Sequence, residues 1–393
     1  MTKDEERRAA GASGQPAWEH IEGRAGSGEV TANGGASAAL LSWYDRNRRI
    51  LPWREDPTPY HVWLSEIMLQ QTRVEAVKKY YLRFTRVLSD IASLSAAPED
   101  VLLKLWEGLG YYSRVRNLQK AAAVMMEKYG GQMPRTKMEL VQLPGIGDYT
   151  ASAIASIAFG ECVPAVDGNL LRIFARMTEY GAGIRTETAK TAAHGFFAPL
   201  MPRERPGDFN QALMDLGSLV CLPNAAPLCG ECPWAEACLA HMHGTASAFP
   251  VPEVKKARKI SQKTVFVIHY HDKIALRRRP EKGLLAGLYE FPNAEGLLDA
   301  GQAAAFVRSL GFEPLRILPL PSAKHIFTHV EWQMQGMDVL VDETAALSGE
   351  PGAEAGAGSG PASAVFMADI AQMNEKYSIP SAFEVYRRAA VEG

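Results

Sequence analysis

The sequence predicts two folded domains of different class, an all-α domain followed by an α+β domain. From about residue 38 to 243, apolar residues recur at helical spacing, whereas after about residue 263 they alternate along the chain. Between these parts lies a polar stretch, 244–262, which holds Pro250, Pro252 and a run of basic residues and is typical of a connector. With 393 residues, the chain is long enough for two domains that each have a core.

Composition excludes several classes of protein. The chain is 47% hydrophobic and 22% charged, as in ordinary globular proteins, and its net charge of -2 argues neither for nor against a nucleic-acid partner. No apolar run reaches the roughly 20 residues that span a bilayer, so we expect no membrane contact. Residues 1–37 are rich in Gly, Ala and Ser and lack the apolar segment of a signal peptide. We therefore expect a disordered tail on a cytoplasmic protein.

The domain at 38–243 is expected to consist of amphipathic helices. Its periodic segments are residues 40–48, 62–71, 75–88, 99–109, 115–128, 150–159, 170–177 and 209–220.

Glu66 lies in one of these helical segments. Val62, Glu66 and Leu69 fall on one helix face, so the carboxyl group is expected among apolar side chains, where burial raises its pKa. A carboxylic acid that is protonated near neutral pH can act as a general acid. The alternative is a surface Glu66 that pairs with Arg73 or Lys79.

The segment 143–150 reads Leu-Pro-Gly-Ile-Gly-Asp-Tyr-Thr and is expected to be a turn before a helix. Gly145 and Gly147 would let backbone N–H groups approach an anion, and the helix that begins near Thr150 adds the positive end of its dipole. The pattern is similar to a helix-hairpin-helix that binds a DNA phosphate. The alternative is a plain turn between two helices.

Asp167 precedes Gly168 at the expected start of a helix, where an aspartate is most often an N-cap. It could also act in catalysis. A glycosidic bond breaks through a transition state with positive charge on the sugar, and an ionised carboxylate facing a protonated one would stabilise that charge. Glu66 and Asp167 could form such a pair.

Cys221, Cys229, Cys232 and Cys238 follow one another with the spacing C-x7-C-x2-C-x5-C. Cysteines so close in a chain of this length suit a metal centre better than disulfides. On spacing alone, both zinc and an iron–sulfur cluster are compatible with four thiolates.

Several further segments carry a resemblance to a known family. They are residues 51–54 (Leu-Pro-Trp-Arg), 68–74 (Met-Leu-Gln-Gln-Thr-Arg-Val), 106–112 (Trp-Glu-Gly-Leu-Gly-Tyr-Tyr) and 166–169 (Val-Asp-Gly-Asn). With the hairpin and the cysteines, they resemble the adenine DNA glycosylases of MutY type over roughly residues 38–342. The resemblance implies a monomeric helix-hairpin-helix glycosylase with an iron–sulfur module and a Nudix-like domain. It also implies a bacterial-type, nucleoid-associated base-excision-repair enzyme that removes adenine opposite 8-oxoguanine or guanine in double-stranded DNA.

The resemblance also implies roles for single residues. Glu66 would protonate the adenine at N7, Asp167 would stabilise the cationic sugar with help from Asn169, and Tyr149 would line the site. The other implied DNA contacts are Trp53, Arg54 and Gln211 at the extruded adenine, Gln71 and Tyr111 as wedges in the base stack, Thr72 as a further substrate contact, and Gly145 and Gly147 at a phosphate.

Position 149 distinguishes two branches of this superfamily. In the endonuclease III branch a lysine here forms a Schiff base with the sugar and so leads to strand cleavage. Tyr149 cannot form an imine, so we expect a monofunctional enzyme. The alternatives are an endonuclease III-like glycosylase and lyase, or a catalytically silent binder of damaged DNA. The neighbouring Asp148 replaces a residue that is usually basic, and an exposed acid would repel a phosphate.

The cysteines depart from the family pattern by one residue, because relatives usually have six residues between the first two. A loop can absorb one residue, so the resemblance implies a [4Fe-4S] cluster on the four cysteines, with zinc as the alternative. Cys162 is expected to be a small buried side chain.

Residues 263–393 are expected to form the Nudix-like domain. Strands are predicted at 264–270, 273–278 and 332–341, helices at 300–310 and 381–390, and a loose insertion at the Gly- and Ala-rich segment 349–363. The run 279–292 resembles a Nudix motif, but no Glu-rich helix pattern follows it, so we expect no pyrophosphate hydrolysis. By the resemblance, Phe327, Thr328 and His329 replace a Phe-Ser-His loop that contacts 8-oxoguanine; otherwise they are strand-edge residues.

Overall fold

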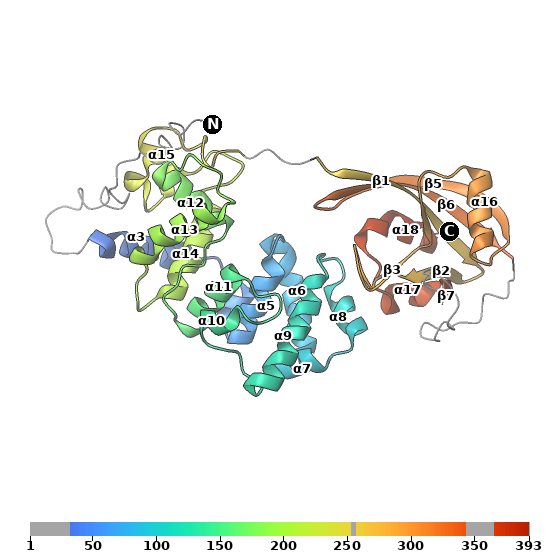
Figure 1. The fold of residues 1–393 in the computed structure, drawn as a ribbon, viewed down its shortest axis with the longest axis horizontal. Coiled ribbons are helices and arrows are strands. Elements are labelled where there is room, and N and C mark those ends of the chain that lie inside the picture. Colours follow the sequence, from blue (N-terminus) through green and yellow to red (C-terminus); the bar gives the residue numbers. More distant parts are fainter. Residues whose placement is uncertain (1–31, 253–256, 343–364, 393) are drawn as a thin grey trace. The chain divides into compact units, whose positions relative to one another are not determined.

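A computed structural model of the chain describes residues 32–252, 257–342 and 365–392. These residues divide into two compact units, one formed by the described residues of 32–95 and 117–252, the other by those of 96–116, 257–342 and 365–392. Figure 1 shows helices in the first unit, and a sheet with covering helices in the second. The predicted insertion at 349–363 and most of the predicted tail lie outside the described residues.

The first unit is helical, as the sequence predicts. The α-helices within it or reaching into it are α3 (Ala32–Asn47), α4 (Pro52–Glu55), α5 (Pro59–Leu69), α6 (Val74–Val87), α7 (Ile91–Ala96), α9 (Ser113–Tyr129), α10 (Lys137–Leu140), α11 (Asp148–Phe159), α12 (Gly168–Thr178), α13 (Glu187–Phe197), α14 (Pro206–Leu219) and α15 (Leu239–Met242). Short 3-10 turns lie at η1 (Ala198–Leu200), η2 (Cys229–Glu231) and η3 (Ala235–Ala237). Among these, α4, α7, α10, α13 and α15 fall outside the predicted segments.

Helix α3 begins before Ala38, so residues 32–37 were wrongly assigned to the tail. They are held by the core of the unit, because Trp234 Nε1 donates to the Ala36 carbonyl at 2.9 Å and the Ser37 hydroxyl donates to the Leu200 carbonyl. Ser37 is itself buried. Partners that are distant in the sequence make this segment part of the fold.

Helices α5, α11 and α14 carry the side chains of the candidate site, among them Glu66, Tyr149 and Asp215. Helix α11 packs against both α5 and α14, and α14 in turn packs against α12 and α3. Behind them lies a core that includes Phe197, Phe209, Leu213 and Trp234. Burial of such large side chains contributes roughly 1.5–3 kcal/mol each, and it fixes the helices whose ends carry the polar site.

The second unit contains a seven-stranded sheet of order β3-β2-β1-β6-β5, in which β4 also pairs with β1 and β7 with β2. The strands of the sheet are β1 (Lys259–Tyr270), β2 (Lys273–Arg278), β3 (Tyr289–Glu290), β4 (Asn293–Glu295), β5 (Pro314–Ile326), β6 (Val330–Val341) and β7 (Val365–Asp369). The helices of the unit are α8 (Glu99–Trp106), α16 (Ala300–Ser309), α17 (Ile370–Lys376) and α18 (Glu384–Glu392), and a 3-10 turn, η5, lies at Ser381–Phe383. Strands β1 and β6 are parallel and the other pairs antiparallel. The α+β prediction is therefore refined to a mixed sheet with helices.

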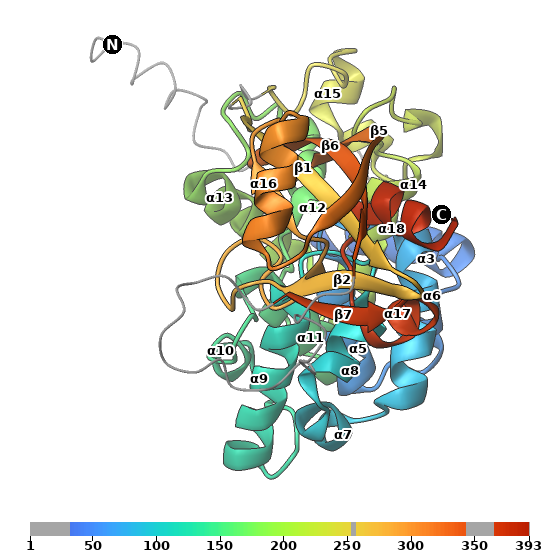
Figure 2. The same ribbon diagram turned by 90° about the vertical axis from the view of Figure 1, so that its right-hand side faces the viewer.

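Strand β1 is buried on both faces of this sheet. Val265 and Val267 belong to the core that contains Phe383 and Tyr386, while Phe266 belongs to the core beneath α16. Figure 2 shows α16 and α18 on opposite sides of the strands. The strand begins at Lys259, so the last residues of the predicted connector belong to the sheet.

Candidate active site and metal centre

Glu66 is buried in the last turns of α5. Only 6% of the residue is exposed, as its place on the apolar helix face predicted, and it does not form the surface ion pair considered as the alternative. The Tyr149 hydroxyl from α11 donates a hydrogen bond of 2.6 Å to Glu66 Oε2. Burial raises the pKa of Glu66 to about 7, with the nearby Asp167 charge adding to the rise and the Tyr149 hydrogen bond and Arg54 opposing it. A substantial protonated fraction at neutral pH follows.

Asp167 is the N-cap of α12 and receives three hydrogen bonds. Its Oδ1 accepts the Asn169 and Leu170 backbone N–H groups at 2.8 and 2.9 Å, and its Oδ2 accepts Asn169 Nδ2 at 2.8 Å. Desolvation raises the pKa of Asp167, but these donors and the charge of Arg172 act in the opposite direction. Asp167 is thus both the predicted cap and a carboxylate whose ionised form has ready-made partners.

Tyr149 donates to Glu66 and lies near enough to Asp167 for that charge to affect the pKa of its phenol. Burial and the charges of Glu66 and Asp167 raise the pKa of Tyr149 well above its usual value, so the phenol stays protonated and donates a hydrogen bond to Glu66. The structure therefore brings together three residues that are far apart in the sequence.

A pocket next to Glu66 contains the predicted adenine contacts. Trp53, Arg54 and Gln211 line it together with Glu66, and Trp53 is held edge-on against Tyr81 with ring centroids 5.4 Å apart. Arg54 and Gln211 also line a wider cavity of about 530 Å³. The pocket offers an apolar wall, a guanidinium, an amide and a carboxyl group, which suits a flat polar ring such as a purine.

The predicted hairpin requires glycine at one of its two positions. Gly145 has φ +76°, and a Cβ atom there would lie 2.6 Å from Asn117 Cβ. Gly147 is the N-cap of α11, which begins at Asp148, two residues earlier than predicted. Asp148 is paired with Lys137 Nζ at 2.7 Å, which reduces the repulsion of a phosphate expected from its charge.

The two predicted wedge residues have unusual backbone conformations. Gln71 has φ +56° in the turn after α5, where the Thr72 N–H donates to the Leu69 carbonyl at 3.1 Å, and Tyr111 has φ +49° and is 46% exposed. A left-handed conformation of a non-glycine residue costs on the order of 1 kcal/mol and is common at functional sites. The turns hold both residues in a conformation that neither favours by itself.

Comparisons with known proteins decide the family. Residues 64–197 match the HhH-GPD superfamily base excision DNA repair protein, and residues 264–388 match the NUDIX domain. The chain is 36% identical to an adenine DNA glycosylase of Mus musculus over 372 residues, which cover 80% of this chain and 72% of the mouse protein. It is 31% identical to that of Buchnera aphidicola subsp. Baizongia pistaciae over 313 residues, which cover 79% and 87%. The chain belongs to the adenine DNA glycosylases.

In this adenine DNA glycosylase, the four predicted metal ligands line one cavity. Cys221, Cys229, Cys232 and Cys238 are all free thiols and surround it together with Trp234. Burial raises the pKa of Cys232 to about 12, and the neighbouring cysteines add to this, so a bound cation is needed to keep four thiolates together. Among the described residues, no group of three or more His, Cys, Asp or Glu side chains has the geometry of a metal site. Four cysteine sulfurs are the donor set of a [4Fe-4S] cluster and also of a zinc site.

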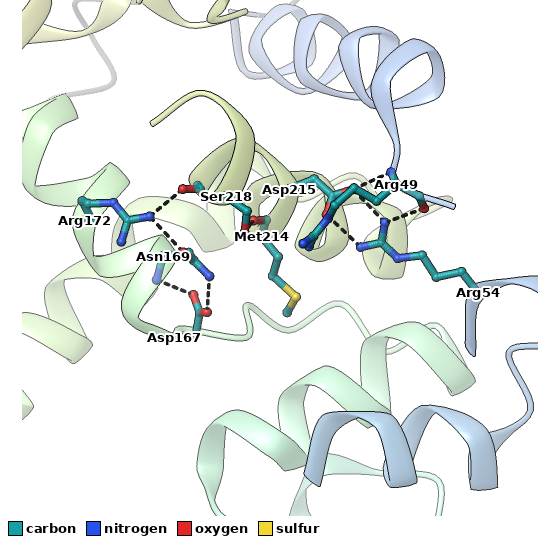
Figure 3. Close-up of polar contacts among 9 residues, drawn as sticks. Arg49, Arg54, Asp167, Asn169, Arg172, Met214, Asp215 and Ser218 are labelled. Atoms are coloured by element: carbon teal, nitrogen blue, oxygen red, sulfur yellow. Dashed lines mark hydrogen bonds and ion pairs between the residues drawn. The ribbon is translucent and has the colours of Figure 1, made fainter. Parts of the chain in front are cut away.

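Two arginines of α12 reach the cysteine segment. Arg172 Nη2 donates to Asn169 Oδ1 at 2.9 Å while its Nε donates to the Cys221 carbonyl at 2.8 Å, and Arg176 Nη1 lies 3.1 Å from Cys221 Sγ. Figure 3 shows Arg172 beside Asn169 and Asp167. Hydrogen bonds thus join the Asp167 end of α12 to the first cysteine.

Cys162 differs from the prediction, because it is exposed. It directly follows Gly160 and Glu161, past the end of α11, and the next residue, Val163, is buried again.

In the second unit, the Phe327–His329 segment forms the turn between β5 and β6. The Phe327 N–H donates to the Val330 carbonyl at 2.8 Å, and the Phe327 ring packs against Trp332 with centroids 4.9 Å apart. Thr328 Oγ1 lies 3.2 Å from the Tyr111 hydroxyl, which belongs to the same unit. Within this unit, two residues that the resemblance assigned to DNA contacts lie side by side.

Sequence reasoning missed Arg49 and Asp215, which belong to the polar surroundings of the base pocket. Arg49 lines the pocket, and Asp215 on α14 is fully buried and ion-paired with Arg49 and Arg54. The only signal for Asp215 was a single acid within the otherwise apolar run 212–217. A buried acid of this kind requires a partner, but the sequence does not identify it.

No helix of the described residues is long and apolar enough to cross a membrane.

Proposed function

We propose that this adenine DNA glycosylase removes adenine that is mispaired with 8-oxoguanine or guanine in double-stranded DNA, and leaves an abasic site. The observation that carries the proposal is the buried Glu66, whose pKa is about 7. Its carboxyl group accepts a hydrogen bond from Tyr149, and the nearby Asp167 charge adds to the rise of its pKa. One carboxyl group can donate a proton while the other balances positive charge.

In the proposed reaction, the target nucleotide leaves the base stack and its adenine enters the pocket of Trp53, Arg54 and Gln211. Glu66 gives its proton to N7 of the adenine, the C1′–N9 bond breaks, and the electron pair leaves with the base. Asp167 stabilises the cationic sugar, with Asn169 holding the carboxylate. Water then adds at C1′ and loses a proton to the Glu66 carboxylate, which restores the acid. Tyr149 offers no amine for a Schiff base, so the phosphodiester bonds stay intact.

The surrounding residues support the recognition steps. Gln71, Thr72 and Tyr111 would fill or border the space that the extruded nucleotide leaves, and the Gly145–Gly147 turn would bind a phosphate through backbone N–H groups. The β5–β6 turn at 327–329 would test the base opposite adenine. Its exposed Tyr111–Thr328 pair supports a direct contact with the opposite strand.

We further propose that Cys221, Cys229, Cys232 and Cys238 hold a [4Fe-4S] cluster. Bound, such a cluster fixes the loop that contains them. Iron and inorganic sulfide in anaerobically purified protein, with a broad visible absorption, are expected. Stoichiometric zinc in colourless protein would replace this assignment by a zinc site.

A single-turnover assay on duplexes with adenine opposite 8-oxoguanine, guanine or thymine tests the function. We expect strand breaks only after hot alkali, and only with the first two duplexes. Breaks without alkali would favour a glycosylase and lyase, and tight binding without excision would favour a silent binder.

A further inference from the structure

Asp215 accepts hydrogen bonds from two arginines at once. Its Oδ2 accepts the Arg49 backbone N–H at 3.1 Å and Arg54 Nη1 at 2.7 Å, while its Oδ1 accepts Arg49 Nε at 2.6 Å and Arg54 Nη2 at 3.1 Å. The Asp215 side chain is completely buried, and that of Arg54 is 13% exposed. Figure 3 shows both guanidinium groups directed at this carboxylate of α14. Every strong acceptor site of Asp215 is therefore used.

The same Arg54 belongs to the pocket that contains Glu66. Its charge opposes the effect of burial on the pKa of Glu66. The other groups that face Glu66 are the Tyr149 hydroxyl from α11 and the Asp167 carboxylate at the start of α12. Asp215 therefore competes with Glu66 for the same guanidinium. A buried arginine that loses one carboxylate turns to another within reach, because an unpaired buried charge is costly.

We propose that Asp215 is a positioning residue, which holds Arg54 and Arg49 in the wall of the base pocket and prevents Arg54 from forming an ion pair with the Glu66 carboxyl group. The inference rests on the proposed function, since it assumes that adenine is protonated by Glu66 in this pocket. Two guanidinium groups share one carboxylate, so the wall keeps one net positive charge. With Asp215 in place, Arg54 stays in the wall of the pocket that takes the adenine and does not pair with Glu66.

The test is the pH dependence of single-turnover adenine excision by Asp215→Asn. If Arg54 turns to Glu66, it holds that carboxyl group in its ionised form, so the pKa of Glu66 falls and the alkaline limb of the profile moves to lower pH. Above the midpoint, the rate drops about tenfold for each unit of that displacement. Asp215→Glu, which keeps the charge, should retain most of the rate.

Arg54→Gln and the double variant Arg54→Gln/Asp215→Asn separate this role from a purely structural one. Arg54→Gln removes a charge that lowers the pKa of Glu66, so its alkaline limb should move to higher pH, opposite to that of Asp215→Asn. The double variant should follow Arg54→Gln, because the displaced guanidinium is gone. If Asp215→Asn alone does not fold, the double variant still decides, because an alkaline limb at lower pH than that of the wild type, with Arg54 absent, would overturn the inference.

Asp45→Asn is the matched control. Asp45 pairs with Arg205 through two hydrogen bonds at the surface, and the change should leave the profile unmoved. A folded Asp215→Asn with the wild-type profile, or a double variant with the profile of Asp215→Asn, would overturn the inference. Absence of adenine excision by the wild-type protein would instead remove the proposed function itself.

Discussion

The surroundings of Glu66 and those of Asp167 differ in exposure and in the number of hydrogen-bond donors, because Glu66 is buried whereas Asp167 is half-buried. Glu66 accepts from one phenol, while Asp167 accepts from two backbone N–H groups and the Asn169 amide at the positive end of α12. Donors stabilise the ionised form, so the same chemical group is directed to two roles. Environment, rather than residue type, makes one the acid and the other the charge stabiliser.

The largest effect is expected for Glu66→Gln, which removes the proton donor and keeps the shape. Single-turnover excision should fall by about 10²–10⁴-fold, because general acid catalysis contributes that much. Binding to mispaired DNA, measured by fluorescence anisotropy, should remain. Glu75→Gln, at an exposed position of α6, serves as control. Normal turnover by Glu66→Gln would contradict the assignment.

Asp167→Asn tests the other half of the comparison. Asparagine is as good an N-cap as aspartate, so α12 should keep its stability while the sugar cation loses its partner. We expect excision to slow by about 10²-fold or more, with little change in the thermal unfolding midpoint. Asp299→Asn changes an equivalent cap of α16 in the second unit and should leave activity intact. Equal loss in both variants would contradict the assignment, because only Asp167 lies beside Glu66 and Tyr149.

Asn169→Ala weakens the donors around Asp167 without touching the carboxylate. Losing this donor raises the pKa of Asp167, and activity needs its ionised form, so the acidic limb of the pH profile should move to higher pH. The rate at neutral pH should fall by about tenfold, the effect of one hydrogen bond to a charged group. Asn47→Ala, which removes a bond to a helix carbonyl in α3, should change neither limb.

Tyr149→Phe should have the smallest effect and the most specific signature. The Tyr149 hydrogen bond lowers the pKa of Glu66, so its loss should raise that pKa above about 7 and move the alkaline limb to higher pH. The rate at neutral pH should change only several-fold, because Glu66 stays protonated. Tyr60→Phe removes a similar buried hydroxyl bond, to the Leu88 carbonyl, and is the control. A limb that moves to lower pH would contradict this account.

The sequence predicted the burial of Glu66 but not the partners of the site residues. The Val62, Glu66 and Leu69 spacing was sufficient to predict a buried acid, because helical periodicity is a local property. The Glu66–Tyr149 contact and the Asp215 ion pairs join residues on different helices, and nothing local indicates such pairing. Likewise, residues 32–37 are helical because Leu200 and Trp234 hold them.

Strand β5 shows a second limit of local patterns. It contains Pro314, Pro319 and Pro321, which argue against a strand. The structure accommodates them in a strand at the end of the sheet, with irregularities between Pro314 and Arg316 and between Leu320 and Ala323. An edge strand lacks one set of partners, so prolines cost it little.

The most direct test of the account is the pH profile of single-turnover adenine excision by the wild-type protein on a duplex with adenine opposite 8-oxoguanine. A protonated Glu66 predicts a rate that falls above about pH 7 as this carboxyl group loses its proton. A rate that stays constant through pH 9 would contradict the assignment of Glu66 as the acid.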